Sequence, residues 1–211
     1  MVLALLVSSV LFLVAYLFIS LYLYKKDNMV SFNMRNHFLF EIYSPSHKVN
    51  GVLNIFLFIA FAMYFTNHLS LAINDFSLTN VIIAVLALLI SVSAIALFYI
   101  PIAREKVHFT FSLVLAISAV MINALLIFPE VRMIRLYEEN LFIIPIVING
   151  LLILTYIFFI VHPSLFNLQM KQDENGELVR PKYFLMSLFE WILITSIFAS
   201  QISVLFLDIL K

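Results

Sequence analysis

Six long apolar stretches, separated by short polar or proline-containing breaks, dominate the pattern of the chain. Each is close to the roughly 20 residues that an α-helix needs to cross the hydrocarbon core of a bilayer. The predicted spans are residues 2–24, 51–69, 81–100, 109–128, 141–161 and 183–207. The pattern therefore predicts an all-α fold, a polytopic membrane helix bundle of six transmembrane helices, with residues 1–211 as a single transmembrane domain.

Proline marks four of the breaks between these stretches. Pro101, Pro129 and Pro163 follow the third, fourth and fifth spans, and Pro181 precedes the sixth. Because proline lacks a backbone N–H and has a fixed φ, it suits the boundary of a helix better than the interior. We therefore expect the fourth helix to end before Pro129.

Basic residues are distributed unevenly between the two sets of loops. The loops after spans one, three and five contain Lys25, Lys26, Arg35, Lys48, Arg104, Lys106, Lys171, Arg180 and Lys182, whereas the opposite side has Arg132, Arg135 and Lys211. Cytoplasmic loops carry the excess of Lys and Arg in membrane proteins. The sequence thus predicts that both termini are non-cytoplasmic, in a bacterial-type cytoplasmic (inner) membrane.

The start of the chain and the two longest basic loops carry further expectations. Because Lys25 and Lys26 directly follow the first span and no small-residue cleavage site is present, we expect a retained helix and not a signal peptide. The loop over residues 25–50 mixes aromatic and basic side chains, as does a segment that lies in the headgroup interface. Residues 173–177 have the composition of a solvated turn.

Composition excludes several classes of function. The chain is 64% hydrophobic and 11% charged, has a formal net charge of zero, and contains no cysteine. Without a basic patch it has no electrostatic footprint for nucleic acid. Without cysteine it has no disulfide, thiolate metal site or cysteine nucleophile. The expected partners are the lipid bilayer and either another membrane protein or a second copy of the chain.

Glu190 is the only ionisable residue well inside a predicted span. A carboxylate at such depth costs roughly 2.5 kcal/mol or more unless it is protonated, paired or wetted. Two interpretations stay open. Glu190 is either a titrating or cation-contacting group in a cavity, or a protonated or hydrogen-bonded carboxyl near the interface beside Trp191.

One face of the sixth span carries residues at alternating spacings of three and four, which places them on a single side of a helix. These are Tyr183, Ser187, Glu190, Ile194, Ile197, Gln201, Val204 and Asp208. We expect this face to point into the bundle. Asn54 and His108 lie in the same membrane half as Glu190, and His108 either pairs with Glu190 or faces water at the interface.

The other half of the predicted membrane region is rich in uncharged polar groups. They are Asn67, His68, Asn123, Asn149 and Gln201, on four different spans at similar depth. Amides in hydrocarbon need hydrogen-bonding partners, so these side chains should converge. They either hold the helices together or line a wet vestibule that opens away from the cytoplasm.

Small and polar residues form matching stripes on the third and fourth spans. The stripes are Asn80, Ala84, Ala87, Ser91 and Ala94 on one span, and His108, Ser112, Ala116, Ala119 and Asn123 on the other. Small side chains let two helix backbones approach closely. These spans should form an antiparallel hairpin packed along the stripes.

Sequence motifs for nucleotide binding, zinc hydrolysis and serine hydrolysis are absent from the chain. The sequence therefore predicts no catalytic residue, metal site or cofactor. The favoured hypothesis is a non-enzymatic integral membrane module, acting as a sensor, an assembly partner or a complex subunit. The first alternative is a small transporter or channel with an outward-facing polar cavity and Glu190 as the titrating group. The second is an intramembrane enzyme with Glu190 or His108 as general base.

Overall fold

The computed structural model describes residues 1–29, 31–35, 37–42, 50–101, 104–137, 140–162, 171–172, 178–179 and 183–209. The expectations for residues 173–177, for Pro163 and Pro181, and for Lys48, Arg180, Lys182 and Lys211 lie outside these ranges.

Six helices in the described part of the chain are long and apolar enough to span a membrane, as predicted. They are α1 (Val2–Asn28), α2 (Asn50–Asn74), α3 (Leu78–Leu97), α4 (Glu105–Tyr137), α5 (Ile143–Val161) and a last helix in three parts, α6 (Leu185–Ser196), η4 (Ile197–Ala199) and α7 (Ser200–Ile209). The short elements are η1 (Leu39–Ile42), η3 (Asn140–Phe142) and the paired two-residue strands β1 (Lys171–Gln172) and β2 (Leu178–Val179). Apart from that strand pair, the described fold is helical, which confirms the predicted class.

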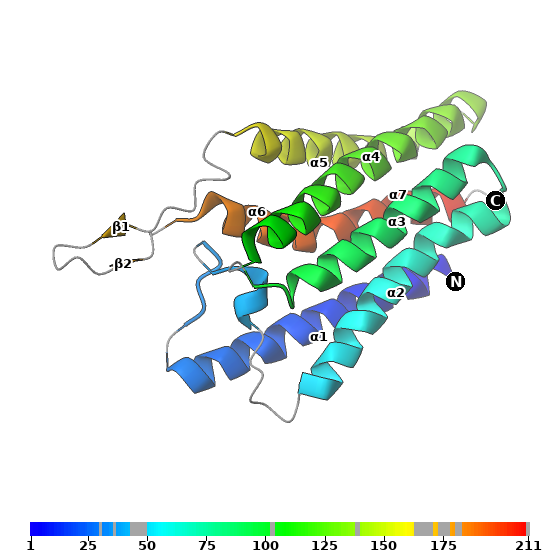
Figure 1. The fold of residues 1–211 in the computed structure, drawn as a ribbon. Helices are drawn as coiled ribbons and strands as arrows, with labels where there is room; N and C mark the ends of the chain where they lie inside the picture. Colours follow the sequence, from blue (N-terminus) through cyan, green and yellow to red (C-terminus); the bar gives the residue numbers. More distant parts are fainter. Residues whose placement is uncertain are drawn as a thin grey trace.

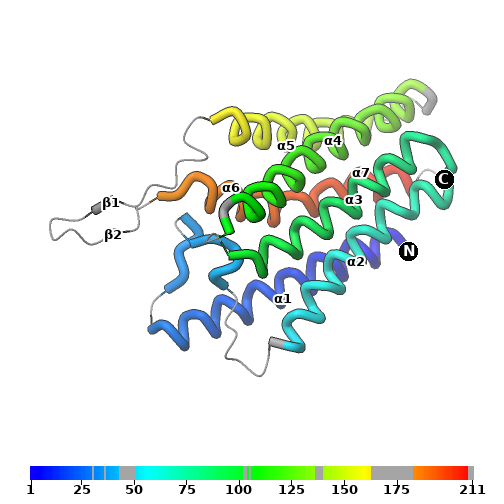
Figure 2. The backbone as a smooth tube through the Cα atoms, in the orientation of Figure 1, coloured from blue at the N-terminus to red at the C-terminus, as the bar shows by residue number. Residues whose placement is uncertain are grey.

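The helices run up and down the bundle, so that both termini lie at one end (Figure 1). We call this end the terminal end. The opposite end holds the last turn of α1, η1 and the strands β1 and β2. We call it the basic end because Lys25 and Lys26 lie in the last turn of α1 and Arg35 contacts Tyr183 just before α6. The last helix lies in the middle of the bundle, with α4 and α5 on one side and α1 and α2 on the other (Figure 2).

The predicted inward face of the last helix is buried. Ser187, Glu190, Ile194, Ile197, Gln201 and Val204 are all at most 1% exposed. Tyr183, at the basic end, is instead 54% exposed, and Asp208, near the other end of the helix, is partly exposed. Burial extends beyond this face to residues such as Phe189 and Leu193, because α6 and α7 have neighbours on several sides.

The fourth helix corrects the sequence prediction. It does not end before Pro129 but continues through it to Tyr137. Proline removes one helical hydrogen bond, yet it is tolerated inside helices of this kind where neighbouring helices and side chains satisfy the freed groups. The extension brings Glu130 into the bundle, so Glu190 is not the only acid inside a spanning helix.

The predicted α3–α4 hairpin is present, and the two helices pack against each other along their length (Figure 1). Ala87, Ala94, Ala116 and Ala119 are at most 1% exposed, as expected for small residues between closely packed helices. Asn80 departs from the stripe, since its side-chain amide donates to the carbonyl oxygens of Leu71 and Asp75 at the α2–α3 turn.

Candidate functional site

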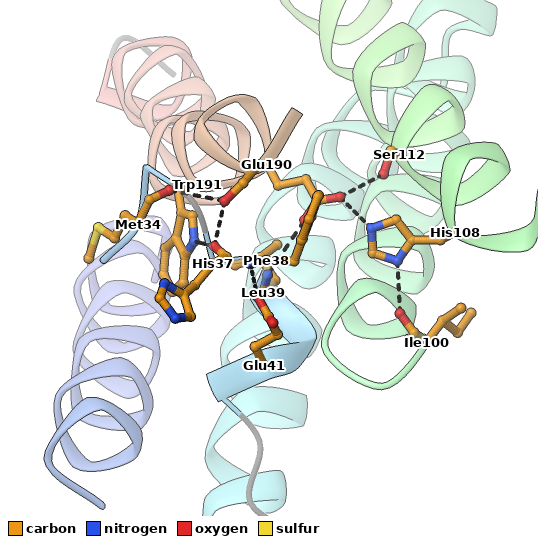
Figure 3. Close-up of polar contacts among 11 residues, drawn as sticks. Met34, His37, Phe38, Leu39, Glu41, Ile100, His108, Ser112, Glu190 and Trp191 are labelled. Carbon is orange, nitrogen blue, oxygen red and sulfur yellow. Dashed lines mark hydrogen bonds and ion pairs between the residues drawn. The ribbon is translucent and has the colours of Figure 1, made fainter. Parts of the chain in front are cut away.

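His108 and Glu190 form a buried pair near the basic end (Figure 3). Nε2 of His108, in the first turn of α4, lies 2.5 Å from Oε1 of Glu190 on α6. Both side chains are 0% exposed, and the Ser112 hydroxyl donates to the same Glu190 oxygen at 3.1 Å. The structure thus confirms the interpretation in which His108 pairs with Glu190. The alternative, in which His108 faces water at the interface, is wrong.

The second ring nitrogen of His108 limits the protonation states of the pair. Nδ1 lies 2.8 Å from the carbonyl oxygen of Ile100, which only accepts, so Nδ1 carries a hydrogen. Without a further proton, Nε2 and the carboxylate oxygen would both be acceptors and could not form a hydrogen bond. One more proton therefore lies between them, either on the imidazole or on the Glu190 carboxyl group. Both arrangements have zero net charge, which is the condition that a low-dielectric interior favours.

A segment between α1 and α2 closes the pair off from the basic end. We call residues 31–42, described except for residue 36, the covering segment. Phe38, Leu39 and Ile42 are at most 2% exposed, and the rings of Phe38 and Phe40 lie edge-on to His108 with centroids 5.8 and 5.9 Å away. The backbone N–H of Leu39 points to Oε2 of Glu190 at 3.5 Å, a long contact. These residues therefore pack on the protein, where the sequence predicted a segment in the headgroup interface.

Polar side chains of α6 anchor the covering segment (Figure 3). The Ser187 hydroxyl contacts the carbonyl oxygens of Met34 at 3.0 Å and His37 at 2.5 Å, and the Trp191 indole N–H donates to His37 O at 2.9 Å. Because Ser187 and Trp191 flank Glu190 on the same helix, the helix that carries the acid also holds its cover.

Asn54 does not join the His108–Glu190 pair, although the sequence grouped the three residues by depth. Its Oδ1 accepts a hydrogen bond from the Tyr99 hydroxyl at 2.8 Å. Asn54 therefore links α2 to the end of α3.

The polar residues of the terminal half form separate groups instead of one cluster. Asn67 Nδ2 donates to Gln201 Oε1 at 2.8 Å, and Gln201 Nε2 donates to the Ser9 hydroxyl at 2.9 Å. This chain of contacts joins α2, α7 and α1. It matches the interpretation of these amides as interhelical contacts.

His68 and Asn123 also lie outside the Asn67–Gln201–Ser9 group. His68 contacts the Tyr64 carbonyl oxygen through Nδ1 at 3.0 Å and the Ser200 hydroxyl through Nε2 at 3.2 Å. Asn123 donates to Ala119 O of its own helix at 2.6 Å, and its Oδ1 has no hydrogen-bond partner among the described residues. Asn123 therefore makes no interhelical hydrogen bond in the described part of the chain.

Asn149 contacts Glu130, a buried acid that the sequence analysis did not identify as a candidate. Its Nδ2 lies 3.1 and 3.2 Å from the two carboxyl oxygens of Glu130 on α4, and 2.8 Å from the Ser203 hydroxyl on α7. Glu130 is 0% exposed. A signal was available, because Glu130 follows Asn123 by seven residues and so continues the polar face of the fourth span across Pro129.

Two cavities beside the described helices lie away from the predicted site residues. One, of about 430 Å³, opens at the terminal end between the α2–α3 turn and α4, and is lined in part by Asp75, Asn80, Pro129 and Arg132. The other, of about 480 Å³, is an apolar groove on the surface of α2 and α3. The predicted vestibule residues bond to other side or main chains and do not line the cavity at that end.

Comparison of the chain with models of protein families, with curated proteins and with solved structures finds no match. The chain's own geometry, above all the covered His108–Glu190 pair, therefore carries the functional argument.

Proposed function

We propose that the chain is a non-enzymatic integral membrane module that senses protonation at its basic end. The observation that carries this proposal is the neutral His108–Glu190 pair, fully buried beneath the covering segment. A pair of this kind shares one proton. The covering segment packs directly on the pair and can move when that proton is lost.

Loss of the shared proton would change the forces between the two groups. The Glu190 carboxylate would then face the lone pair of His108 Nε2 at 2.5 Å, and the two would repel. The buried charge would also draw in water. Since Phe38 and Phe40 cover His108 and Leu39 contacts Glu190, the covering segment is the part that has to move.

The elements around the pair carry other ionisable groups. They are Arg35, His37 and Glu41 in the covering segment, Lys25, Lys26 and Asp27 at the end of α1, Arg104 and Lys106 around the start of α4, Tyr156 on α5, and Tyr183 before α6. Glu41 accepts a hydrogen bond from the Phe38 N–H at 2.7 Å and so helps to order the cover. The response to pH therefore has to be assigned with a substitution in the pair itself.

The proposed orientation places the basic end in the cytoplasm of a bacterial-type inner membrane and both termini outside. The excess of Lys and Arg at that end supports it. Because the chain has no cysteine, single cysteines at Met29 and Phe76, 93% and 88% exposed at opposite ends, can report the sidedness. An impermeant thiol reagent added outside should label Phe76→Cys and not Met29→Cys, and the reverse pattern would contradict the orientation.

The central test measures access to the covering segment as a function of pH. Phe40→Cys places a thiol beside His108, and Met29→Cys serves as an exposed reference for the pH dependence of thiol chemistry itself. In purified protein in lipid nanodiscs, we expect the labelling rate of Phe40→Cys relative to Met29→Cys to rise severalfold as the pair loses its proton at high pH.

Substitutions of Glu190 show whether the pair causes the response. Glu190→Gln replaces the carboxyl group by an amide, which cannot become the carboxylate that repels His108, so the ratio of labelling rates should stay flat at high pH. Glu190→Asp should keep a pH response. Size-exclusion profiles identify variants that fail to fold. A flat ratio in the protein with native Glu190, or an equal rise in Glu190→Gln, would contradict the sensor.

A small transporter or channel is the second candidate, favoured by the polar contacts that continue along the last helix. Tyr156 contacts Ser196 at 2.8 Å, Tyr64 contacts Ser200 at 3.2 Å, and Gln201 follows. Proton flux into proteoliposomes that falls in both Glu190→Gln and Asn149→Ala would support it. The enzyme hypothesis has less support, since a general base needs access to substrate and both members of the pair are buried.

A further inference from the structure

Glu130 is a buried acid without a basic partner. Its side chain is 0% exposed, and among the described residues no Lys, Arg or His lies within ion-pair distance of its carboxyl group. Its hydrogen-bonding contacts are to the neutral side chains Asn149 and Ser203. An ionised carboxylate in such surroundings would be costly, since nothing nearby compensates its charge.

The arrangement of Asn149 specifies how the acid is held. The amide uses its donor nitrogen for Glu130 and Ser203, while Asn149 Oδ1 has no partner among the described residues. Asn149 thus offers the carboxyl hydrogen bonds but no charge. A cation would need oxygen ligands, and the nearest amide presents its nitrogen instead.

We propose that Glu130, Asn149 and Ser203 form a second proton-binding site, in which Glu130 is the protonated acid. The site exchanges its proton with the solution at the terminal end. It is independent of the sensor at the basic end, because the residues of the two sites make no contact with one another.

We place the exchange route at the cavity of the terminal end, which borders the segment of α4 around Glu130 although Glu130 itself does not line it. Its walls include Phe128, Pro129, Arg132 and Met133, the residues on either side of Glu130 in α4. The ionisable groups on the elements around the site are Asp75, Arg132, Arg135, Asp208 and His68. Arg132 and Asp75 both line the cavity and are exposed. The Arg132 guanidinium, the nearest basic group along α4, therefore faces solvent and makes no ion pair with Glu130.

Infrared spectroscopy of the full chain in lipid vesicles tests the proposal, because a protonated carboxyl has a carbonyl stretch that a carboxylate lacks. We expect one such band to disappear in Glu130→Gln and to remain in Glu190→Gln. The band should fade reversibly as the pH outside the vesicles is raised. The cavity variant Asp75→Asn is the matched control and should keep the band.

Two further measurements keep the test decisive. Asn149→Leu retains the acid but removes its donor, so the band should shift in frequency without being lost, even if Glu130→Gln folds poorly. Loss of the band on adding NaCl at constant pH would identify a cation site and overturn the proposal. The proposal also fails if no band differs between the native chain and Glu130→Gln at any pH. These infrared results are independent of the labelling response of the covering segment, so this proposal and the proposed sensor can fail separately.

Discussion

The two buried acids among the described residues lie toward opposite ends of the bundle and have different partners. Glu190 faces the imidazole of His108 at 2.5 Å, whereas Glu130 faces the amide of Asn149 at 3.1 Å. Helix α4 contributes residues to both sites. His108 and Glu130 are 22 positions apart on it, about 33 Å by helical rise, comparable with the thickness of a hydrocarbon core.

The difference between the partners sets what each acid can do. Beside a base, the proton belongs to the pair, and removing it leaves two groups that repel. Beside an amide, the acid has to keep the proton itself. We therefore expect the loss of one member of the basic-end pair to have a large, pH-linked effect, and the loss of the amide donor at the terminal end to have a smaller one.

The largest effect is expected for His108→Ala, which leaves Glu190 buried without its partner. Breaking a buried ion pair from one side typically costs about 3–5 kcal/mol. Equilibrium unfolding in mixed micelles measures the loss. His162→Ala, at the partly exposed end of α5, is the control and should change stability by about 0.5 kcal/mol or less. A similar small change for His108→Ala would mean that the pair does not hold the helices.

At the terminal end, Asn149→Leu removes the donor to Glu130 while filling the space with an apolar side chain. We expect a loss of about 1–2 kcal/mol in the free energy of unfolding, since buried acceptors lose their hydrogen bond but no ion pair is broken. The same unfolding assay applies. A loss as large as that of His108→Ala would show that Glu130 is charged and that the two ends are alike.

Ser112→Ala removes one contact to Glu190 and leaves His108 in place. A single hydrogen bond between membrane helices contributes about 0.6 kcal/mol on average, so we expect a loss of that order. Thr110→Ala on the same helix is the matched control, because the Thr110 hydroxyl bonds only the carbonyl of Lys106 in the preceding turn. Equal losses in the two variants would remove Ser112 from the site.

The smallest change in stability is expected when both members of the pair are replaced together, as in His108→Leu with Glu190→Met. Replacing a buried ion pair by apolar groups of similar size is often neutral, so the free energy of unfolding should change by less than the roughly 0.6 kcal/mol expected for Ser112→Ala. The labelling response of the covering segment to pH should nevertheless be lost. A double variant as unstable as His108→Ala alone would show that packing, and not charge, holds this end together.

Much of the fold was predictable from the chain alone. Six apolar stretches of sufficient length, the inward face of the last helix and the small residues between α3 and α4 all follow from local spacing and hydropathy. The candidate site was predictable in part. Glu190 and His108 were identified as candidates on separate helices, but their contact required the lateral arrangement of α4 and α6.

The sequence by itself determined which residues are apolar enough for lipid and which polar ones need a partner, because both follow from side-chain chemistry and helical period. Only the tertiary structure decided the partners. It carried α4 through Pro129 and so buried Glu130, divided the amides of the terminal half into separate groups, and packed Phe38 and Leu39 over the His108–Glu190 pair. These outcomes depend on distances between helices, which no periodicity within a single helix encodes.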